Sequence, residues 1–470
     1  MKALIVAADA ITPEYVVEKR KLFPNINNIM EHGAMCTYSG YVQRGYSGSY
    51  SSGQNWVSIY TGLPPKEHGK NRQASLKMRD ICEFEPFWQI LNKNGLTTGL
   101  WSFRYSEPIE IDGYIISSRY EPIFTPQDIR EAPRTISVSE KDKQMLRLFD
   151  SAPPPRLYPK TLKQHGLTFE KVKENPELVD IVANEATFQP MLDNFEAELR
   201  FWFNAMTKAQ RDIPVDVVYF FTPSTDILTH FILYSDNNPI LIKAYQLLDN
   251  YIGRFVEEFK PDITVLMSDH GQQNFKYIVD CSNPDTQREA FSERDKAIWL
   301  KNGYIAFEAL NGGLLFTTHT LKGVFIASGN GIKNVQVSEM RTLDIYPTLL
   351  EIFGIEIPEG RNGFVVDIFN RPVTNSGKLL KSSEIIYASI ALIQAHEVSI
   401  TDIILNELYL EKRFARITVV GEAKYEEIFR NNPRVFDFVS YRKFDASDFD
   451  EVFCGFYNKA SKQMNHIRVK

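Results

Sequence analysis

An aspartate and a histidine stand side by side at the end of an apolar stretch, in the segment DITVLMSDHGQ from Asp262 to Gln272. The run ITVLM is typical of a buried strand, and a turn after it would favour Asp or Gly but has no use for His. A carboxylate next to an imidazole is a usual ligand pair for zinc or manganese. Asp269 and His270 therefore predict a metal site, whose other ligands must lie elsewhere in the chain.

Further carboxylates and imidazoles occur in comparable places. Asp9 follows the first apolar run, ALIVAA. Asp226 and His230 stand four residues apart in FTPSTDILTHF, so both side chains face the same way if this segment starts a helix. His319 lies in what we expect to be a loop before the apolar run GVFIAS. Asp9 alone is more often a turn residue or helix cap, and a lone His near an apolar strand is more often structural. The Asp226 and His230 pair on a helix is a surface pair about as often as a metal pair. Together they form the usual ligand set for zinc or manganese.

The elements that would position these side chains form a regular alternation. The runs ALIVAA, VDVVYFF, ITVLMS and GVFIAS are nearly continuous in apolar residues, which predicts a mostly parallel sheet buried on both faces. Amphipathic segments lie between them and predict flanking helices, hence an α/β fold. One such stripe comprises Leu248, Tyr251, Ile252, Phe255 and Phe259. Ligands of α/β sheets gather at the carboxyl ends of strands, which is where the three acids are expected.

Two regions depart from this alternation. Residues 105–215 contain the loop-like SAPPPRLYPK and a long amphipathic helix, LDNFEAELRFWFNAMTKA, and we predict that they form a cap-like insertion over the site. Residues 376–470 contain ARITVVGEAKYEEIF and EVFCGFY, which predict a small C-terminal α/β accessory unit. Its histidines, His396 and His466, belong to no motif, so we expect no metal ligand there. The catalytic domain would then comprise residues 1–375.

Composition narrows the class of protein. The 470 residues carry a net charge of −6 without a basic block, so nucleic acid is not expected as the main partner. No apolar stretch is long enough to span a membrane, and the first run is too short for a secretion signal. The four cysteines are widely spaced and give no disulfide framework, so we expect a cytoplasmic protein. The oligomeric state stays open.

One more stretch, SYSSGQNWVSIYTGLPPKEHGKN, makes the chain resemble the alkaline phosphatase superfamily, and within it the branch of nucleotide pyrophosphatases and phosphodiesterases. The branch's pattern Thr-Gly-x-x-Pro-x-x-His-Gly is filled here by Thr61, Gly62, Pro65, His68 and Gly69. The segments FPNINNIMEHGAMC and LDIYPTLLEIFGIEIPEGRNG resemble the family's early and closing segments. Six motifs in the family's order cover about residues 1–105 and 215–370, which implies an alkaline-phosphatase-like core.

The resemblance implies a hydrolase of small phosphorylated substrates that works through two divalent ions and a nucleophile. Ser52 holds the nucleophile position, nine residues before Thr61 and four before Trp56, where phosphodiesterases mostly have Thr. The implied ligands are Asp9, Ser52, Asp269 and His270 for one ion, and Asp226, His230 and His319 for the other. We expect zinc, because His and Asp in equal numbers suit it, with manganese as the alternative. Ser52 would form a phosphoseryl intermediate.

Other residues near the nucleophile have weaker assignments. Asn71 is a candidate for holding a non-bridging phosphoryl oxygen, with a turn residue as an equal alternative. His68 is expected to brace its loop, and Trp56 to be part of the core. The chain also departs from the family at Ala10, where Gly usually follows the first aspartate.

Other functions on the same scaffold are weighed beside hydrolysis of a diester or pyrophosphate. A phosphomonoesterase is one alternative, and a phosphoryl transferase or mutase is another. The cofactor-independent phosphoglycerate mutases resemble this ligand set, use Ser and take manganese. A non-catalytic binding module is disfavoured because the full set of clustered ligands is present. The sulfatases need Cys or Ser followed by x-Pro-x-Arg, which is missing after both Ser52 and Cys36.

Overall fold

The computed structural model describes residues 1–40, 52–69, 81–103, 111–117, 154, 157–232, 238–274, 297–300, 305–308, 313–320, 322–380, 388–394, 401, 404–405, 408, 415–430, 437–458 and 463–468. By their contacts, the residues divide into two compact units, which we describe separately. The first comprises Met1–Gly40, Ser52–Tyr277 and Asp295–Leu379. The described residues of the second all follow Leu379.

An eight-stranded sheet forms the centre of the first unit, in the order β13-β2-β12-β6-β1-β5-β3-β4. Its strands are β1 (Ala3–Ala8), β2 (Gly33–Ser39), β3 (Thr98–Phe103), β4 (Gly113–Ser117), β5 (Val217–Thr222), β6 (Ile263–Met267), β12 (Lys322–Gly329) and β13 (Val335–Arg341). β1 pairs in parallel with both β5 and β6. Within this sheet β12 runs antiparallel to both of its neighbours, β6 and β2. The prediction of an α/β fold with a mostly parallel central sheet is confirmed.

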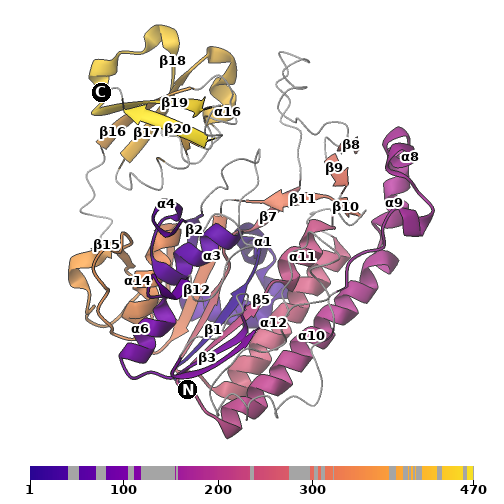
Figure 1. Cartoon of the computed structure of the whole chain (residues 1–470), viewed down its shortest axis with the longest axis vertical. Helices are drawn as coiled ribbons and strands as arrows, with labels where there is room; N and C mark the ends of the chain where they lie inside the picture. The colour runs from indigo at the N-terminus through magenta and orange to yellow at the C-terminus, as the bar shows by residue number, and fades with distance from the viewer. Residues whose placement is uncertain are drawn as a thin grey trace. The chain divides into compact units, whose positions relative to one another are not determined.

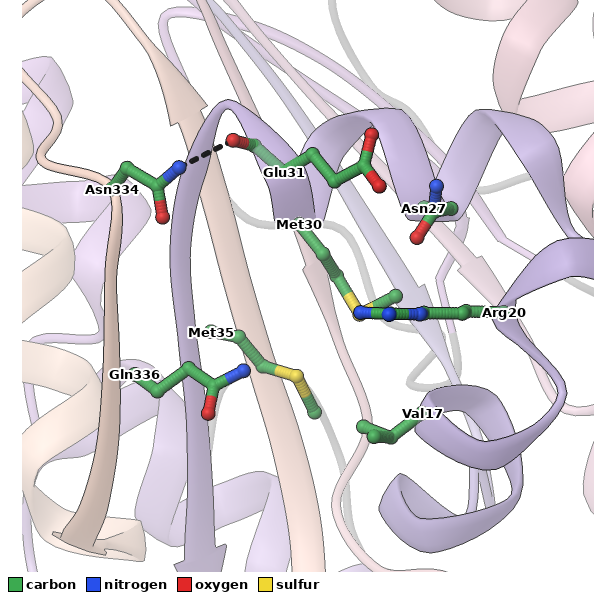
Figure 2. A pocket seen from close by; sticks show the side chains of 8 residues that line it. All are labelled: Val17, Arg20, Asn27, Met30, Glu31, Met35, Asn334 and Gln336. Carbon is green, nitrogen blue, oxygen red and sulfur yellow. Dashed lines mark hydrogen bonds between the residues drawn. The ribbon is translucent and has the colours of Figure 1, made fainter.

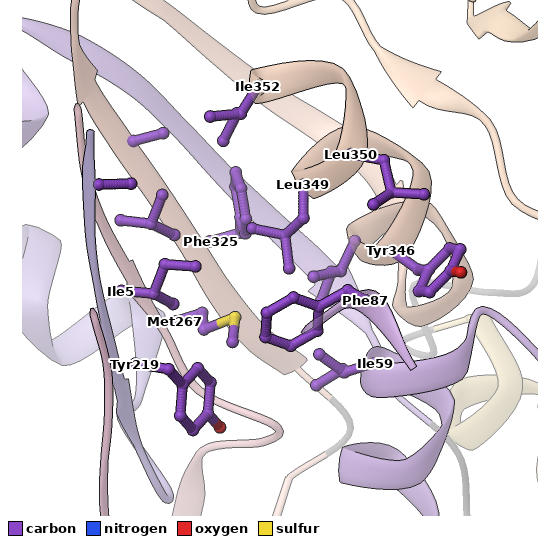
Figure 3. Close-up of a cluster of buried hydrophobic side chains, with 14 of the residues drawn as sticks. Ile5, Ile59, Phe87, Tyr219, Met267, Phe325, Tyr346, Leu349, Leu350 and Ile352 are labelled. Carbon is purple, nitrogen blue, oxygen red and sulfur yellow. The ribbon is translucent and has the colours of Figure 1, made fainter. Parts of the chain in front are cut away.

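Helices cover both faces of this sheet (Figure 1). One face packs against α3 (Ser52–Thr61), α6 (Phe87–Lys93) and α14 (Thr342–Ile352), and the other against α2 (Pro24–Glu31), α10 (Glu185–Asp212) and α12 (Pro239–Phe259). Successive side chains of β1 alternate between the faces. Ile5 joins the cluster around Phe87 and Leu349 (Figure 3), whereas Val6 joins the cluster around Phe255. Burial on both faces explains why these strands read as continuous apolar runs.

The helix α12 shows how local sequence determines where a helix begins, where it ends and which face is buried. It begins at Pro239, directly after Asn238, whose side chain accepts hydrogen bonds from the backbone N–H groups of Ile240 (3.0 Å) and Leu241 (3.2 Å). Such a cap satisfies N–H groups that have no partner within the helix. Lys260 ends the helix in the left-handed conformation. All five residues of its predicted apolar stripe are buried against the sheet.

Two elements within the range that we predicted as an insertion, 105–215, belong to the core instead. β4 extends the central sheet by pairing in parallel with β3. The apolar stripe of α10 packs against the sheet, where Trp202 contacts Trp101 with ring centroids 6.3 Å apart. The sequence pattern missed this because an apolar stripe is the same for a lid helix and for a helix on a sheet. The cap itself stays a prediction.

Short elements beside the sheet complete the described part of the first unit, and the last of them, β15, ends one residue into the second unit. They are α1 (Pro13–Glu18), η1 (Arg20–Leu22), α4 (Pro65–His68), η3 (Lys163–His165), α8 (Phe169–Glu174), η4 (Pro176–Leu178), α9 (Val179–Val182), α11 (Ser224–His230), β14 (Val365–Val366), η7 (Ser376–Lys378) and β15 (Leu379–Leu380). A three-stranded sheet contains β8 (Ala297–Trp299), β9 (Ile305–Glu308) and β10 (Leu314–Leu315). A two-stranded ribbon pairs β7 (Gln272–Asn274) with β11 (Thr317–His319). His319 therefore ends a short strand, not a loop as expected.

The second unit is a small α/β unit with a five-stranded sheet in the order β18-β17-β16-β19-β20. Its elements are β16 (Ala388–Ile393), β17 (Ala415–Gly421), η9 (Ala423–Tyr425), α16 (Glu426–Arg430), β18 (Asp437–Ser440), η10 (Tyr441–Lys443), η11 (Ala446–Asp448), β19 (Glu451–Asn458) and β20 (Gln463–Arg468). β16 pairs in parallel with β17 and β19, and β20 is antiparallel to β19. His396 lies outside the described residues, and His466 is described only by its backbone in β20. The domain boundary at 375 stays a prediction.

Candidate metal centre

Five of the six predicted acidic and imidazole ligands come from segments at the carboxyl ends of three adjacent strands, and a short ribbon brings in the sixth, His319. Asp9 directly follows β1, and Asp269 and His270 come just after the end of β6. Asp226 and His230 lie in α11, which begins just after β5. β11 brings His319 opposite Gln272 of β7, which follows the Asp-His-Gly motif. This is the edge of the sheet where ligands of α/β folds gather.

The first group of side chains surrounds Nε2 of His270. This atom lies 3.3 Å from Oδ1 of Asp9 and 3.3 Å from Oδ2 of Asp269. Oγ of Ser52, the first residue of α3, lies 2.8 Å from the same nitrogen. All four side chains are buried. The two carboxylates and the imidazole lie close enough together to bind one metal ion.

The second group surrounds Oδ1 of Asp226. This oxygen lies 3.3 Å from Nε2 of His230 and 3.2 Å from Nε2 of His319, and the two nitrogens are 2.8 Å apart. The ring of His270 stacks on that of His319, with centroids 3.7 Å apart and planes at 17°. Ligand atoms of Asp226, His270 and His319 also meet closely enough for one ion. The two groups are therefore adjacent, and His270 of the first group lies beside Asp226 and His319 of the second.

In the neutral form that binds a metal, His230 and His270 carry lone pairs on the nitrogens that face these carboxylates. Nδ1 of His230 lies 3.2 Å from the carbonyl oxygen of Thr317, and Nδ1 of His270 lies 3.1 Å from that of Gly271. A carbonyl only accepts, so the ring proton of each neutral imidazole belongs on Nδ1 and Nε2 is bare. A bare nitrogen and a carboxylate oxygen repel each other unless a cation lies between them. The donor set therefore fits divalent ions such as zinc or manganese.

Burial and charge set the protonation of this cluster. Burial favours the neutral acid of Asp226, but His230 and His319 outweigh it and hold the pKa of Asp226 well below its usual range. Burial likewise acts to lower the pKa of His230, yet Asp226 raises it overall. Burial, and then His319, lower the pKa of His270 far below its usual value. His270 is thus held neutral, which is the form that binds a metal.

Hydrogen bonds tie together the loops that carry the ligands. Oγ of Ser268, which has one hydrogen to donate, lies 3.0 Å from the carbonyl oxygens of both Ile11 and His270. The hydroxyl of Thr225 donates to the carbonyl oxygen of Asp9 at 2.5 Å. Ala10 has a φ of 64°, a left-handed conformation that glycine adopts without strain. This explains why the related family usually has Gly at this position.

The other predicted residues fall in different places. Trp56 is fully buried in the core, and its Nε1 donates to Oδ2 of Asp9 at 3.4 Å. His68 is buried with Nε2 3.1 Å from Oγ of Ser58, which joins α4 to α3 in the bracing role that we expected. Asn71 lies outside the described residues. Gln272 was not among the predicted residues, although its position directly after Asp-His-Gly was a usable signal.

The comparison with protein families decides the assignment. The family model for type I phosphodiesterase/nucleotide pyrophosphatase matches residues 3–313. The chain belongs to this family. Members of the type I phosphodiesterase/nucleotide pyrophosphatase family are hydrolases that act on small phosphorylated substrates and depend on metal ions. The predictions of the family and of an enzyme of this class are confirmed.

Comparisons with individual proteins add little to this family assignment. Sequence comparison with curated proteins gave no match. Among solved structures, human ectonucleotide pyrophosphatase/phosphodiesterase 5 aligns with a TM-score of 0.41 and 14% identity, over 77% of this chain and 97% of that chain. The murine protein aligns with a TM-score of 0.41 and 12% identity, and its inactive form in complex with AMP aligns with a TM-score of 0.40 and 13% identity. The coverage of both chains is the same in all three comparisons.

A cavity of about 200 Å³ lies away from this cluster (Figure 2). It is lined by Val17, Arg20, Asn27, Met30, Glu31, Met35, Asn334 and Gln336. Figure 2 shows Arg20, Met30 and Met35 pointing toward the same space. Met35 and Gln336 stand near the amino ends of β2 and β13, so the cavity is at the opposite edge of the sheet from the ligands. We assign it no role in the site.

Among the parts of the chain that the structure describes, no helix combines the length and the apolar character needed to cross a bilayer.

Proposed function

We propose that this member of the family hydrolyses a phosphodiester or pyrophosphate bond with Ser52 as the nucleophile and two divalent ions as cofactors. The observation that carries the proposal is the position of the Ser52 hydroxyl. Its Oγ lies 2.8 Å from Nε2 of His270, which belongs to the first group and lies beside Asp226 and His319 of the second. A nucleophile at this junction can reach a phosphoryl group held between two ions.

In this proposal Asp9, Asp269, His270 and Ser52 hold one ion, and Asp226, His230 and His319 hold the other. When bound, the ions lower the pKa of the serine hydroxyl and neutralise charge on the phosphoryl oxygens. Ser52 loses its proton to solvent. Its oxygen then forms a bond to phosphorus as the bond to the leaving oxygen breaks, and that oxygen takes up a proton from water. Water attacks the phosphoserine in a second step and frees Ser52.

The chain's own residues determine how the nucleophile is presented. Ser52 begins α3, so the first N–H groups of the helix have no partner within it and suit a bound phosphoryl oxygen. The buried surroundings of Ser52 and His270 exclude bulk water and strengthen electrostatic interactions with a transferred phosphoryl group. We propose zinc for both ions because imidazole and carboxylate ligands occur in equal numbers.

The substrate and the location are proposed more broadly. We propose a small phosphorylated molecule as substrate. We also propose a cytoplasmic location, which is supported by three free cysteines among the described residues, Cys36, Cys82 and Cys454.

Metal analysis and two small substrates test the proposal. Plasma emission on protein purified without chelator is expected to find two divalent ions per chain, zinc before manganese. The protein should release nitrophenol from bis-nitrophenyl phosphate faster than from nitrophenyl phosphate. Fewer than one ion per chain would contradict the two-ion centre. A preference for the monoester, or transfer of phosphate to an alcohol acceptor, would favour a phosphomonoesterase or a transferase instead.

A further inference from the structure

Gln272 contacts the candidate ligands from inside the cluster, although it belongs to none of the motifs. Its side chain is 2% exposed, and its Nε2 donates a hydrogen bond to Oδ1 of Asp226 at 2.7 Å. The same nitrogen lies 3.5 Å from Nε2 of His230. Oδ1 of Asp226 is also the atom that faces both imidazoles of the second group. Gln272 therefore contacts the oxygen around which that group is arranged.

The backbone of Gln272 is fixed on two sides. Its N–H donates to Oγ1 of Thr12 at 2.9 Å, in the loop that follows Asp9. Its strand, β7, pairs with β11 so that Gln272 stands opposite His319. With the backbone held, the side chain reaches Asp226 from a defined position, and little conformational freedom is lost on forming the bond. Such support is typical of groups that orient metal ligands.

The neighbours of the Gln272 side chain determine which end of its amide is the NH₂ group and which is the oxygen. Oδ1 of Asp226 only accepts hydrogen bonds, so the NH₂ end of the amide must face it in the ion-free protein. The other end, Oε1, is buried and has no hydrogen-bond partner among the described residues. A buried amide oxygen without a donor is costly, so this side chain is not held in place by stability alone. Among the described residues, the one short hydrogen bond of this side chain is to the carboxylate of Asp226.

We infer that Gln272 is a positioning residue of the Asp226 site, which holds the carboxylate so that Oδ1 faces His230 and His319. This inference rests on the two-ion centre proposed above. A neutral donor suits the task because a lysine would compete with the metal ion by its charge, whereas a glutamate would repel Asp226. Loss of such an outer contact typically weakens metal binding about 10- to 100-fold.

The test measures binding of Co²⁺ and Zn²⁺ to the full chain after treatment with a chelator, by calorimetry and by the visible absorption of bound Co²⁺. The variant Gln272→Met keeps the length of the side chain but removes the donor. It is expected to bind one of two ions about 10- to 100-fold more weakly than the unchanged protein. Gln273→Met is the matched control, because Gln273 is the exposed neighbour on the same strand, and it should bind both ions normally.

A double-mutant cycle separates positioning from direct ligation. If Gln272 acts through Asp226, Gln272→Met should have no further effect on Co²⁺ affinity in a chain that already carries Asp226→Ala. If Gln272→Met lowers Co²⁺ affinity as much in the Asp226→Ala chain as in the unchanged chain, the amide oxygen is itself a ligand and the inference is wrong. Normal affinity of Gln272→Met for both ions would also overturn the inference. If the unchanged chain binds fewer than two ions, the proposed function fails first. Thermal unfolding in the presence of EDTA shows whether each ion-free variant is folded. If Gln272→Met does not fold, Gln272→Ala is used in its place.

Discussion

The residue with the most direct role in the proposed chemistry is Ser52. Four serines occur within six residues, at 47, 49, 51 and 52, and only Ser52 falls within the described residues. It is 3% exposed and lies beside His270, which burial and His319 keep neutral. A hydroxyl at this position can attack a phosphoryl group, whereas an alanine there leaves all the carboxylate and imidazole ligands in place.

Replacing Ser52 with alanine is expected to lower turnover about a thousandfold or more, because a nucleophile that acts together with its activators is removed. Both ions should stay bound, since their carboxylate and imidazole ligands are unchanged. Steady-state kinetics on bis-nitrophenyl phosphate and metal analysis provide the measurements. Ser51→Ala is the control and should cost far less. Near-normal turnover in Ser52→Ala would rule out both the assignment and the covalent intermediate.

Among the elements, α14 shows how a buried charge holds a segment at the end of the first unit. Glu351 is fully buried on α14, and its Oε1 accepts from Nη1 of Arg371 at 3.0 Å and from the backbone N–H of Thr374 at 2.9 Å. Its Oε2 accepts from the backbone N–H of Asn375 at 3.0 Å. These bonds attach the segment 371–375 to the helix, so the chain follows the core at least this far.

Changing Glu351 to alanine should destabilise the first unit by about 3 kcal/mol. The change removes the charged carboxylate that accepts hydrogen bonds from Arg371 and from two backbone N–H groups, and it leaves those donors unpaired. Denaturant unfolding followed by tryptophan fluorescence measures the effect. Glu356→Ala, five residues later and exposed, should stay within about 0.5 kcal/mol of the unchanged protein. Equal midpoints for the two variants would show that the buried carboxylate does not anchor this segment.

At the scale of the whole molecule, all the candidate ligands belong to the first unit. The cluster places three carboxylates and three imidazoles within a few ångströms of one another, in buried or partly buried positions. Bound divalent ions would compensate charges that otherwise repel and would stabilise the folded state over the unfolded chain. Ion binding and the stability of the first unit should therefore be linked.

Removing the ions with EDTA should lower the melting temperature of the first unit. Free ion at a hundredfold excess over its dissociation constant stabilises by about 2.7 kcal/mol per site, and chelation removes that contribution. Scanning calorimetry should show a transition several degrees lower, and added Zn²⁺ should restore it. An unchanged transition would mean that the cluster does not bind ions in the folded protein.

A shortened chain that ends after Lys381 keeps β15. It should still bind two ions and retain part of its activity on nitrophenyl substrates. The reason is that the second unit supplies no candidate ligand among its described residues. Circular dichroism first establishes that the shortened chain folds, and metal analysis then counts the ions. A folded shortened chain with fewer than one ion would show that residues beyond 381 are needed for the site.

The sequence by itself predicted the α/β class, the strands β1, β5, β6 and β12, and the edge of the sheet at which the acids collect. It could do so because apolar runs and helical stripes are local patterns, and parallel strands end at one edge of a sheet. The same patterns misjudged α10 and β4, since they do not indicate which surface an apolar stripe covers. That choice depends on segments far apart in the chain.

Only the tertiary structure decided which atoms meet at the cluster. The stacking of His270 on His319, the contacts of the Nε2 atoms of these two rings with Asp9 and Asp226, and the hydrogen bond from Gln272 to Asp226 all join separate segments. The register of β7 with β11 and the bond from Gln272 to Thr12 fix those segments. Residue types and spacing name candidate ligands, but the direction of a side chain is set by packing with distant parts of the chain.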